Sequence, residues 1–289
     1  SNASATTAFV GTKTGTVSVN ISDTVFSIEP AETISNYMTY DSSMTLPGVI
    51  GFYRCNGSNL RFHAKLEVPS SEVTDVKWTS SDTTVLTVTG NTVTAVGAGS
   101  ATLTLTAKFG GKTYPYEKSI TVSEKSITNS GIACTIPTTY YDPAGAKPKP
   151  VLTYNGKTLV ENRDYEITSY RGNLSATSSA YVDILGKGNF YGSRSFKFEI
   201  LQRSLSDCEL SEIPDVYYTG SAVSPAPTLT FNGTALSKGT DYTVSFADNT
   251  LPGTATVTIT GKSNYTGEKP ATFKINKQIP DNLTISSIQ

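Results

Sequence analysis

The chain has 289 residues, of which 37% are hydrophobic and only 16% are charged, and its formal net charge is −1. Nucleic-acid binding depends on neutralising phosphates, so a chain without a cluster of Lys and Arg is a poor candidate for that function. The sequence is rich in Thr, Ser, Gly and Tyr, and no apolar stripe of helical period exceeds about two turns. These features predict an all-β protein, long enough for roughly two to four domains.

The first 58 residues are the least informative part. The opening "SNA" looks like the remnant of an expression tag, so residues 1–3 are set aside and the natural N-terminus is taken to be missing. In residues 4–58, the run "TVSVNISDTVFSI" predicts one or two strands, and "TLPGVIGFYRCNG" predicts a loop and a strand. This part either completes the sandwich that follows it or finishes a preceding domain.

Residues 59–123 predict a β-sandwich, because short strand-like segments alternate with Gly, Asn and Asp turn signals. The segments are "NLRFHAKLEV", "DVKWTSSD", "VLTVTGNTVTAV", "SATLTLTAKF" and "KTYPYEKSITV". This stretch resembles the bacterial immunoglobulin-like domain, group 2. The positions that carry the resemblance are Trp78, Ser80, Ser81, Asp82, Val85, Val88, Gly97, Gly99, Ala101 and Leu103.

The second half contains an internal repeat, in which residues 125–202 recur at 203–277. "SAYVDILGKGNFYGSRSFKFEI" aligns with "TATVTITGKSNYTGEKPATFKI". Every second position stays apolar in both copies while its neighbours change, which predicts strands with one buried and one solvated face. The apolar positions are Ala180, Val182 and Ile184 against Ala255, Val257 and Ile259; Leu152 and Tyr154 against Leu229 and Phe231; and Phe198 and Ile200 against Phe273 and Ile275.

Asn-Gly pairs at 155–156 and 232–233 follow this apolar alternation in both copies. Asn-Gly readily adopts the positive φ angles of a tight two-residue turn, so each pair predicts a β-hairpin.

The repeat resembles a module found in tandem on surface proteins of Gram-positive gut bacteria. The second copy carries that pattern in "YYTG", "GTDYTVSFADN" and "GKSNYTG", whereas the first departs from it with "YYDP", "NRDYEI" and "GKGNFYG". Together with the group 2 domain, the resemblance implies an extracellular, cell-wall-associated protein. The predicted architecture is a series of tandem immunoglobulin-like β-sandwich modules in an elongated arrangement. The expected boundaries are 4–123, with a group 2 core at 59–123, then 124–201 and 202–277; residues 278–289 are a tail or the start of another module.

The sequence offers no catalytic constellation. His63 is the single histidine and shares the polar face of "LRFHAKL" with two basic residues, so a solvated imidazole is expected. Cys55, Cys134 and Cys208 lie far apart, without metal-ligand spacing, and are expected to be free and buried. The nearest approach to a calcium loop, "ADNTLPG", is weak. No metal, no cofactor and no enzymatic activity are predicted.

Two features have competing interpretations. Asp164 and Asp241 recur at the same place in both copies, which favours turn carboxylates that accept backbone N–H groups over catalytic acids. Gly261-Lys262-Ser263 ends like a phosphate-binding loop. However, position 256 is Thr where that motif needs Gly, and a strand pattern follows where it needs a helix. This segment is therefore predicted to join two strands.

Tyrosines near turns are the candidate ligand-contacting residues. One member of each adjacent Tyr pair must face outward, where its ring could stack on a sugar or anchor a protein. The alternative, favoured because both copies keep these tyrosines although their surfaces differ, is that these rings close the ends of each sandwich, and Tyr265 is expected to close the end of its core. The candidates are Tyr140, Tyr141, Tyr191, Tyr217, Tyr218 and Tyr265.

Three functions fit these patterns. The first is a non-catalytic, monomeric surface protein whose modules form a stalk or spacer. The second is an adhesin that binds glycans or a host surface protein through tyrosines. The third is a set of accessory domains from a larger secreted enzyme. No nucleic-acid partner and no membrane insertion are expected of this segment.

Overall fold

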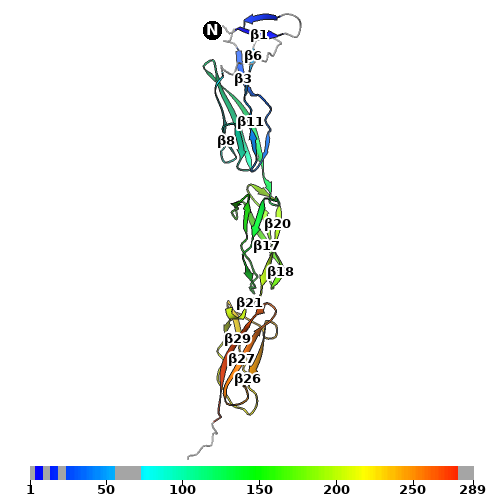
Figure 1. The fold of residues 1–289 in the computed structure, drawn as a ribbon, viewed down its shortest axis with the longest axis vertical. Coiled ribbons are helices and arrows are strands. Elements are labelled where there is room, and N and C mark those ends of the chain that lie inside the picture. The colour runs from blue at the N-terminus through cyan, green and yellow to red at the C-terminus, as the bar shows by residue number, and fades with distance from the viewer. Residues whose placement is uncertain (1–3, 9–13, 19–23, 56–72, 279–289) are drawn as a thin grey trace, which may run out of the picture. The chain divides into compact units, whose positions relative to one another are not determined.

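The computed structural model describes residues 4–8, 14–18, 24–55 and 73–278 (Figure 1). The described residues fall into two compact units. One comprises those within Ser1–Asn129 together with Glu161–Glu166 and Gly186–Gly192; the other comprises those within Ser130–Val160, Ile167–Leu185 and Ser193–Gln289.

The first unit contains a sandwich of two sheets. Its four-stranded sheet has the order β4-β11-β10-β7, made of Tyr37–Thr39, Lys112–Ser123, Gly99–Phe109 and Thr74–Ser80. Its three-stranded sheet has the order β5-β9-β8, made of Ser43–Thr45, Thr92–Ala95 and Leu86–Thr89. Two antiparallel pairs precede or interleave with these sheets: β1 (Ser4–Ala8) with β2 (Thr14–Ser18), and β3 (Thr24–Pro30) with β6 (Val49–Cys55).

The apolar faces of the two sheets meet in one core. Trp78, Leu86 and Leu105 belong to it, and the Trp78 indole N–H donates to the Pro47 carbonyl over 3.3 Å. The predicted strands within 73–123 are confirmed by β7 to β11, whereas "NLRFHAKLEV" and His63 lie outside the described residues.

Residues 34–46 complete this first sandwich. β4 pairs in parallel with the end of β11, and β5 pairs antiparallel with β9. Ile34, Met38 and Leu46 are buried in the same core as Trp78. For residues 4–58 the sequence left two alternatives open, completion of the following sandwich or the end of a preceding domain. Residues 34–46 follow the first alternative.

The rest of the chain shows one strand order twice. A three-stranded sheet, β13-β15-β16, corresponds to β22-β24-β25, and a four-stranded sheet, β14-β20-β18-β17, corresponds to β23-β29-β27-β26. The first set is Ile132–Thr135, Val151–Tyr154, Lys157–Thr158, Thr139–Tyr140, Ser193–Leu201, Thr177–Gly186 and Tyr165–Arg171. The second set is Glu209–Leu210, Leu229–Phe231, Thr234–Ala235, Val216–Tyr217, Glu268–Asn276, Gly253–Gly261 and Tyr242–Ala247. Two short parallel pairs complete the topology: β12 (Lys125–Ser126) with β19 (Phe190–Tyr191), and β21 (Arg203–Ser204) with β28 (Tyr265–Thr266), followed by a 3-10 turn, η3, at Leu205–Asp207.

Burial and turn geometry confirm the predicted strands. All fourteen apolar positions that recur between 152–200 and 229–275 are buried. Both Asn-Gly pairs form two-residue hairpins, with φ of 46° and 78° at 155–156 and of 49° and 76° at 232–233. Hence the chain is all-β and built of immunoglobulin-like sandwiches, as the sequence predicts. The boundaries between modules and the elongated arrangement stay predictions.

The cysteines only partly follow the expectation. Cys134 and Cys208 are free thiols, and Cys208 is buried, but Cys134 is only half-buried and lines a groove together with residues of β20. The Cys55 side chain lies outside the described set.

Among the described residues, no helix is long and apolar enough to cross a membrane.

Candidate functional site

The two tyrosine pairs place one ring outward and one inward, as strand geometry requires. Tyr140 and Tyr217 are 46% and 63% exposed, while Tyr141 and Tyr218 are half-buried. Each inward tyrosine donates its backbone N–H to the end of the neighbouring strand: Tyr141 to the Leu201 carbonyl and Tyr218 to the Asn276 carbonyl.

Tyr265 and Tyr191 differ because they occupy different positions of the repeat. "GKGNFYG" and "GKSNYTG" align Phe190 with Tyr265 and Tyr191 with Thr266. Phe190 and Tyr265 are buried, whereas Tyr191 is 52% exposed. Burial raises the pKa of the Tyr265 phenol well above its usual range. Tyr265 has no ring face left for a ligand, which favours the alternative interpretation that it closes a core.

Tyr141 and Tyr265 come together at a joint inside the second unit. Their rings meet edge to face, 5.3 Å apart. Asn264 directly precedes Tyr265; its side-chain oxygen accepts the Ala176 backbone N–H at 2.9 Å, and its carbonyl accepts the Arg203 N–H at 2.9 Å. The asparagine thus fastens a loop of the first copy and the linker to a turn of the second copy.

Arg203 adds further contacts at this joint. Its Nε donates to the Tyr141 carbonyl over 3.0 Å, and its guanidinium carbon lies 4.5 Å from the ring centre of Phe231 and 5.6 Å from that of Tyr140. One face of the exposed Tyr140 ring is therefore covered by a cation, a favourable arrangement worth about 0.5–1 kcal/mol at exposed sites.

The same contact pattern occurs in the first unit. The Tyr40 and Phe190 rings meet edge to face at 5.5 Å, and the Asn189 side chain accepts the Ala98 N–H at 2.8 Å. The Asn189 carbonyl accepts the Lys125 N–H at 2.9 Å. We call this arrangement the asparagine clamp: Asn189 with Ala98 in the first unit, and Asn264 with Ala176 in the second.

The Gly-Lys-Ser segment serves the fold, as predicted. The Lys262 Nζ donates to the Gly239 carbonyl at 2.8 Å, and the Ser263 hydroxyl donates to the Thr240 carbonyl at 2.9 Å. A Cβ added to Gly261 would come within 2.7 Å of the Thr266 backbone nitrogen, so the turn requires glycine there. Both polar side chains therefore bind the backbone of the turn that precedes β26.

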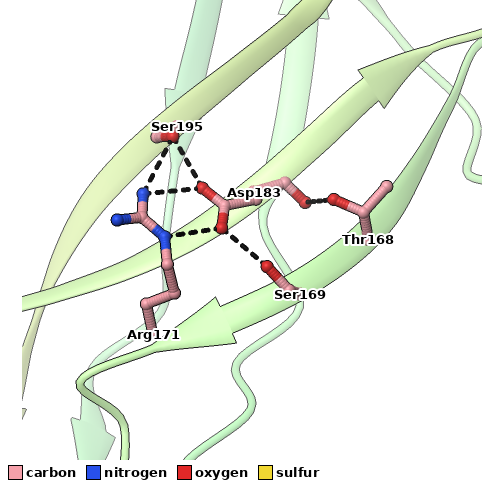
Figure 2. A network of polar contacts seen from close by, with 5 residues as sticks. All are labelled: Thr168, Ser169, Arg171, Asp183 and Ser195. Atoms are coloured by element: carbon pink, nitrogen blue, oxygen red, sulfur yellow. Dashed lines mark hydrogen bonds and ion pairs between the residues drawn. The ribbon is translucent and has the colours of Figure 1, made fainter.

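A polar network that sequence reasoning missed lies on the solvated face of β17, β18 and β20 (Figure 2). The Asp183 carboxylate accepts from the Arg171 Nε at 2.7 Å and Nη2 at 2.9 Å, and from the hydroxyls of Ser169 and Ser195 at 2.6 Å each. These hydrogen bonds hold the pKa of Asp183 well below its usual range. The carboxylate is thus held ionised and fully engaged, which suits cross-strand fastening rather than proton transfer.

The duplicated aspartates have structural environments. The Asp241 carboxylate accepts the Ser237 backbone N–H at 2.8 Å, as predicted for a turn. Asp164 is buried and forms a two-point ion pair with Arg163, with contacts of 3.1 and 2.8 Å. Within the described part of the chain, no group of three or more His, Cys, Asp or Glu residues could hold a metal ion.

A sequence signal for the asparagine clamp was present. Asn189 and Asn264 are identical in the two copies although their neighbours at 188 and 190 change to Ser263 and Tyr265. The Asp183 network had no such signal, because Asp183 and Ser195 are replaced by Thr258 and Pro270 in the second copy.

Comparison with protein families identifies one segment. The model of the bacterial Ig-like domain (group 2) matches residues 56–116, in agreement with the resemblance carried by Trp78 and its neighbours. That domain type is not a catalytic one. No curated protein matches the sequence.

Among solved structures, the chain is similar to the protocadherin GammaB4 extracellular domain, with 11% identity over 91% of this chain and 52% of that one and a TM-score of 0.27. It is also similar to Sidekick-1 immunoglobulin domains 1–5 (10%, 88% and 59%, TM-score 0.25) and to surface layer protein SbsC domains 4–9 (12%, 88% and 47%, TM-score 0.19). The chain thus spans about half the length of the protocadherin structure. With TM-scores this low, none of these similarities supports a functional argument.

Proposed function

We propose that the chain is a segment of a non-catalytic, extracellular, multi-domain bacterial surface protein whose immunoglobulin-like modules act as a stalk or spacer. The observation that carries the proposal is the asparagine clamp, in which Asn189 and Asn264 each accept two backbone N–H groups, from Ala98 and Lys125 in one unit and from Ala176 and Arg203 in the other. A spacer transmits position or force only if its joints resist bending, and each joint here combines a hydrogen-bonded asparagine with an edge-to-face aromatic pair. The group 2 match supports the assignment to a surface-protein type.

The test is to hold the full chain by its two ends and to stretch it. Modules with separate cores are expected to unfold in successive, separate events, because each core is lost independently. A single cooperative event for the whole chain would contradict the stalk.

A second candidate is adhesion through an exposed tyrosine. Tyr217 favours it, since its ring is 63% exposed at the end of a strand. The test is a glycan and mucin array probed with the full chain and with Tyr217→Ala. Binding that the substitution abolishes would support adhesion, and an array without signal would exclude its carbohydrate form. Host proteins and glycans stay proposals as partners.

A further inference from the structure

Within the part of the chain that the structure describes, no strand pairs with the outer edge of β20 from Ser193 to Glu199. β20 pairs with β18 on one side, while on the other β14 pairs only with Ile200 and Leu201. The Leu201 carbonyl points outward, because it accepts the Tyr141 N–H. Backbone groups alternate in direction along a strand, so those of Ser193, Ser195, Lys197 and Glu199 also point toward this edge.

Equivalent edges elsewhere in the chain are protected. The hydrogen bond from the Tyr141 N–H to the Leu201 carbonyl has two counterparts, one from the Tyr40 N–H to the Ser123 carbonyl and one from the Tyr218 N–H to the Asn276 carbonyl. Ser123 on β11 and Asn276 on β29 therefore correspond to Leu201 on β20. On β29, Pro270 stands at the outward position that Ser195 occupies on β20, and on β11 an outward position is filled by Pro115. Proline has no N–H to offer to an added strand and is a common protection of sheet edges.

A second protection is also missing from β20. The Lys274 N–H on β29 donates to the Asp215 carboxylate at 3.0 Å, and the Thr121 N–H on β11 donates to the Asn36 carbonyl at 2.8 Å. The corresponding residue of β20 is Glu199, and Asp215 is replaced there by Thr138, which has no carboxylate to accept a backbone N–H.

A groove of about 380 Å³ runs along this open edge. Ile136, Phe196 and Phe198 supply apolar lining, while Lys197 and Glu199 provide charged groups. Because side chains alternate along β20, the apolar groups face the inside of the sandwich edge and the charged groups face the solvent. The free stretch from Ser193 to Glu199 is about 20 Å long at 3.3 Å per residue.

We propose that the open edge of β20 is a docking site for an extended peptide segment of another protein, which adds to the sheet as a further strand beside Ser193–Glu199. The pairing continues that of β14, which already holds the last two residues of the same edge. Backbone hydrogen bonds supply the affinity, and apolar residues at every second position of the peptide fill the groove.

The test uses a display library of decapeptides in which apolar and polar residues alternate, selected against the full chain. Ser195→Pro copies the edge of β29 and removes one outward N–H. Ser195→Ala is the matched control, because it loses the same hydroxyl contact to Asp183 but keeps the N–H. Thr138→Asp introduces the carboxylate that protects β29, and it serves as a second blocking variant that leaves the backbone unchanged.

Selected peptides are expected to bind the wild-type chain and Ser195→Ala, and to bind Ser195→Pro at least about tenfold more weakly. The amides of Lys197 and Glu199 should become protected from hydrogen exchange in the complex. The paired substitutions Asp215→Thr and Pro270→Ser should create binding at the edge of β29. Failure to select any peptide, or equal binding to a folded Ser195→Pro or Thr138→Asp variant, would overturn the proposal. Reversible dimerisation of the chain alone, lost in Ser195→Pro, would overturn it in favour of a second copy as the occupant.

Discussion

Replacing Asn264 by Ala removes the side-chain acceptor that holds the Ala176 N–H at 2.9 Å. A hydrogen bond of this kind contributes about 1 kcal/mol net, and the half-buried Ala176 amide regains only part of it from water. The aromatic pair Tyr141–Tyr265 and the backbone bond from Arg203 remain. The joint is therefore weakened rather than abolished, by about 1 kcal/mol, or about fivefold in its opening equilibrium.

The assay is amide hydrogen exchange, followed residue by residue on the full chain. In Asn264→Ala, the Ala176 amide should exchange about fivefold faster. Asn264→Asp is the matched control, because a carboxylate oxygen still accepts the same N–H, and its Ala176 amide should stay protected. The Ala98 amide, held by Asn189 in the other unit, is an internal reference that should not change. An Ala176 exchange rate that is the same in the wild type and in Asn264→Ala would refute this account of the joint.

Three further outcomes are expected. Asp183→Thr, which copies Thr258 of the second copy, should lower the free energy of unfolding by about 1 kcal/mol at pH 7. Hydrogen bonds from Arg171 and two serines depress the pKa of Asp183, so this stabilisation is complete above the unfolded pKa of about 3.9, and the difference from wild type should shrink as the pH falls below that value. A difference in chemical denaturation that does not depend on pH would contradict the role of the charge. Gly261→Ala should lower the free energy of unfolding by about 1–3 kcal/mol, since the added Cβ would lie 2.7 Å from the Thr266 nitrogen. The control Gly48→Ala, whose Cβ meets nothing within 4 Å, should change it by less than about 0.5 kcal/mol. Equal effects of the two substitutions in urea denaturation would show that the turn at Gly261 tolerates a side chain. In a Cys55→Ser background, iodoacetamide should label the half-buried Cys134 before the buried Cys208, as followed by mass spectrometry. Both reactions should be slow at pH 8, because burial raises the pKa of both thiols. Faster labelling of Cys208 would place that side chain at the surface.

Periodicity and internal comparison were sufficient for the strands of the sandwiches. Val182 and Val257 are apolar in both copies because both face a core, and a strand alternates its faces strictly, so their burial followed from the sequence. The hairpins followed for a similar reason, since the backbone geometry of Asn155-Gly156 depends on two adjacent residues alone.

Contacts between segments far apart in the chain could not be predicted in this way. The sequence predicted that Tyr265 closes the end of a core, and Tyr265 is buried, but its edge-to-face contact with Tyr141 of the other copy was not predicted. The Asp183 network depends on residues of three strands whose register no local pattern specifies. The pairing of β4 with β11 and of β5 with β9 could not be predicted either, because strands of three residues are too short to show an alternation of apolar and polar residues.

The central claim, that the modules of the second unit are held in a fixed orientation at the clamp around Asn264, is tested most directly by residual dipolar couplings of backbone amides. Couplings measured on the full chain for residues 130–160, 167–185 and 193–201, and for residues 203–277, should fit one common alignment tensor. In Asn264→Ala, where the aromatic pair and the Arg203 hydrogen bond remain, the two sets should diverge only slightly from a common tensor. Two independent tensors in the wild-type chain would show a flexible link at this joint and would contradict the claim.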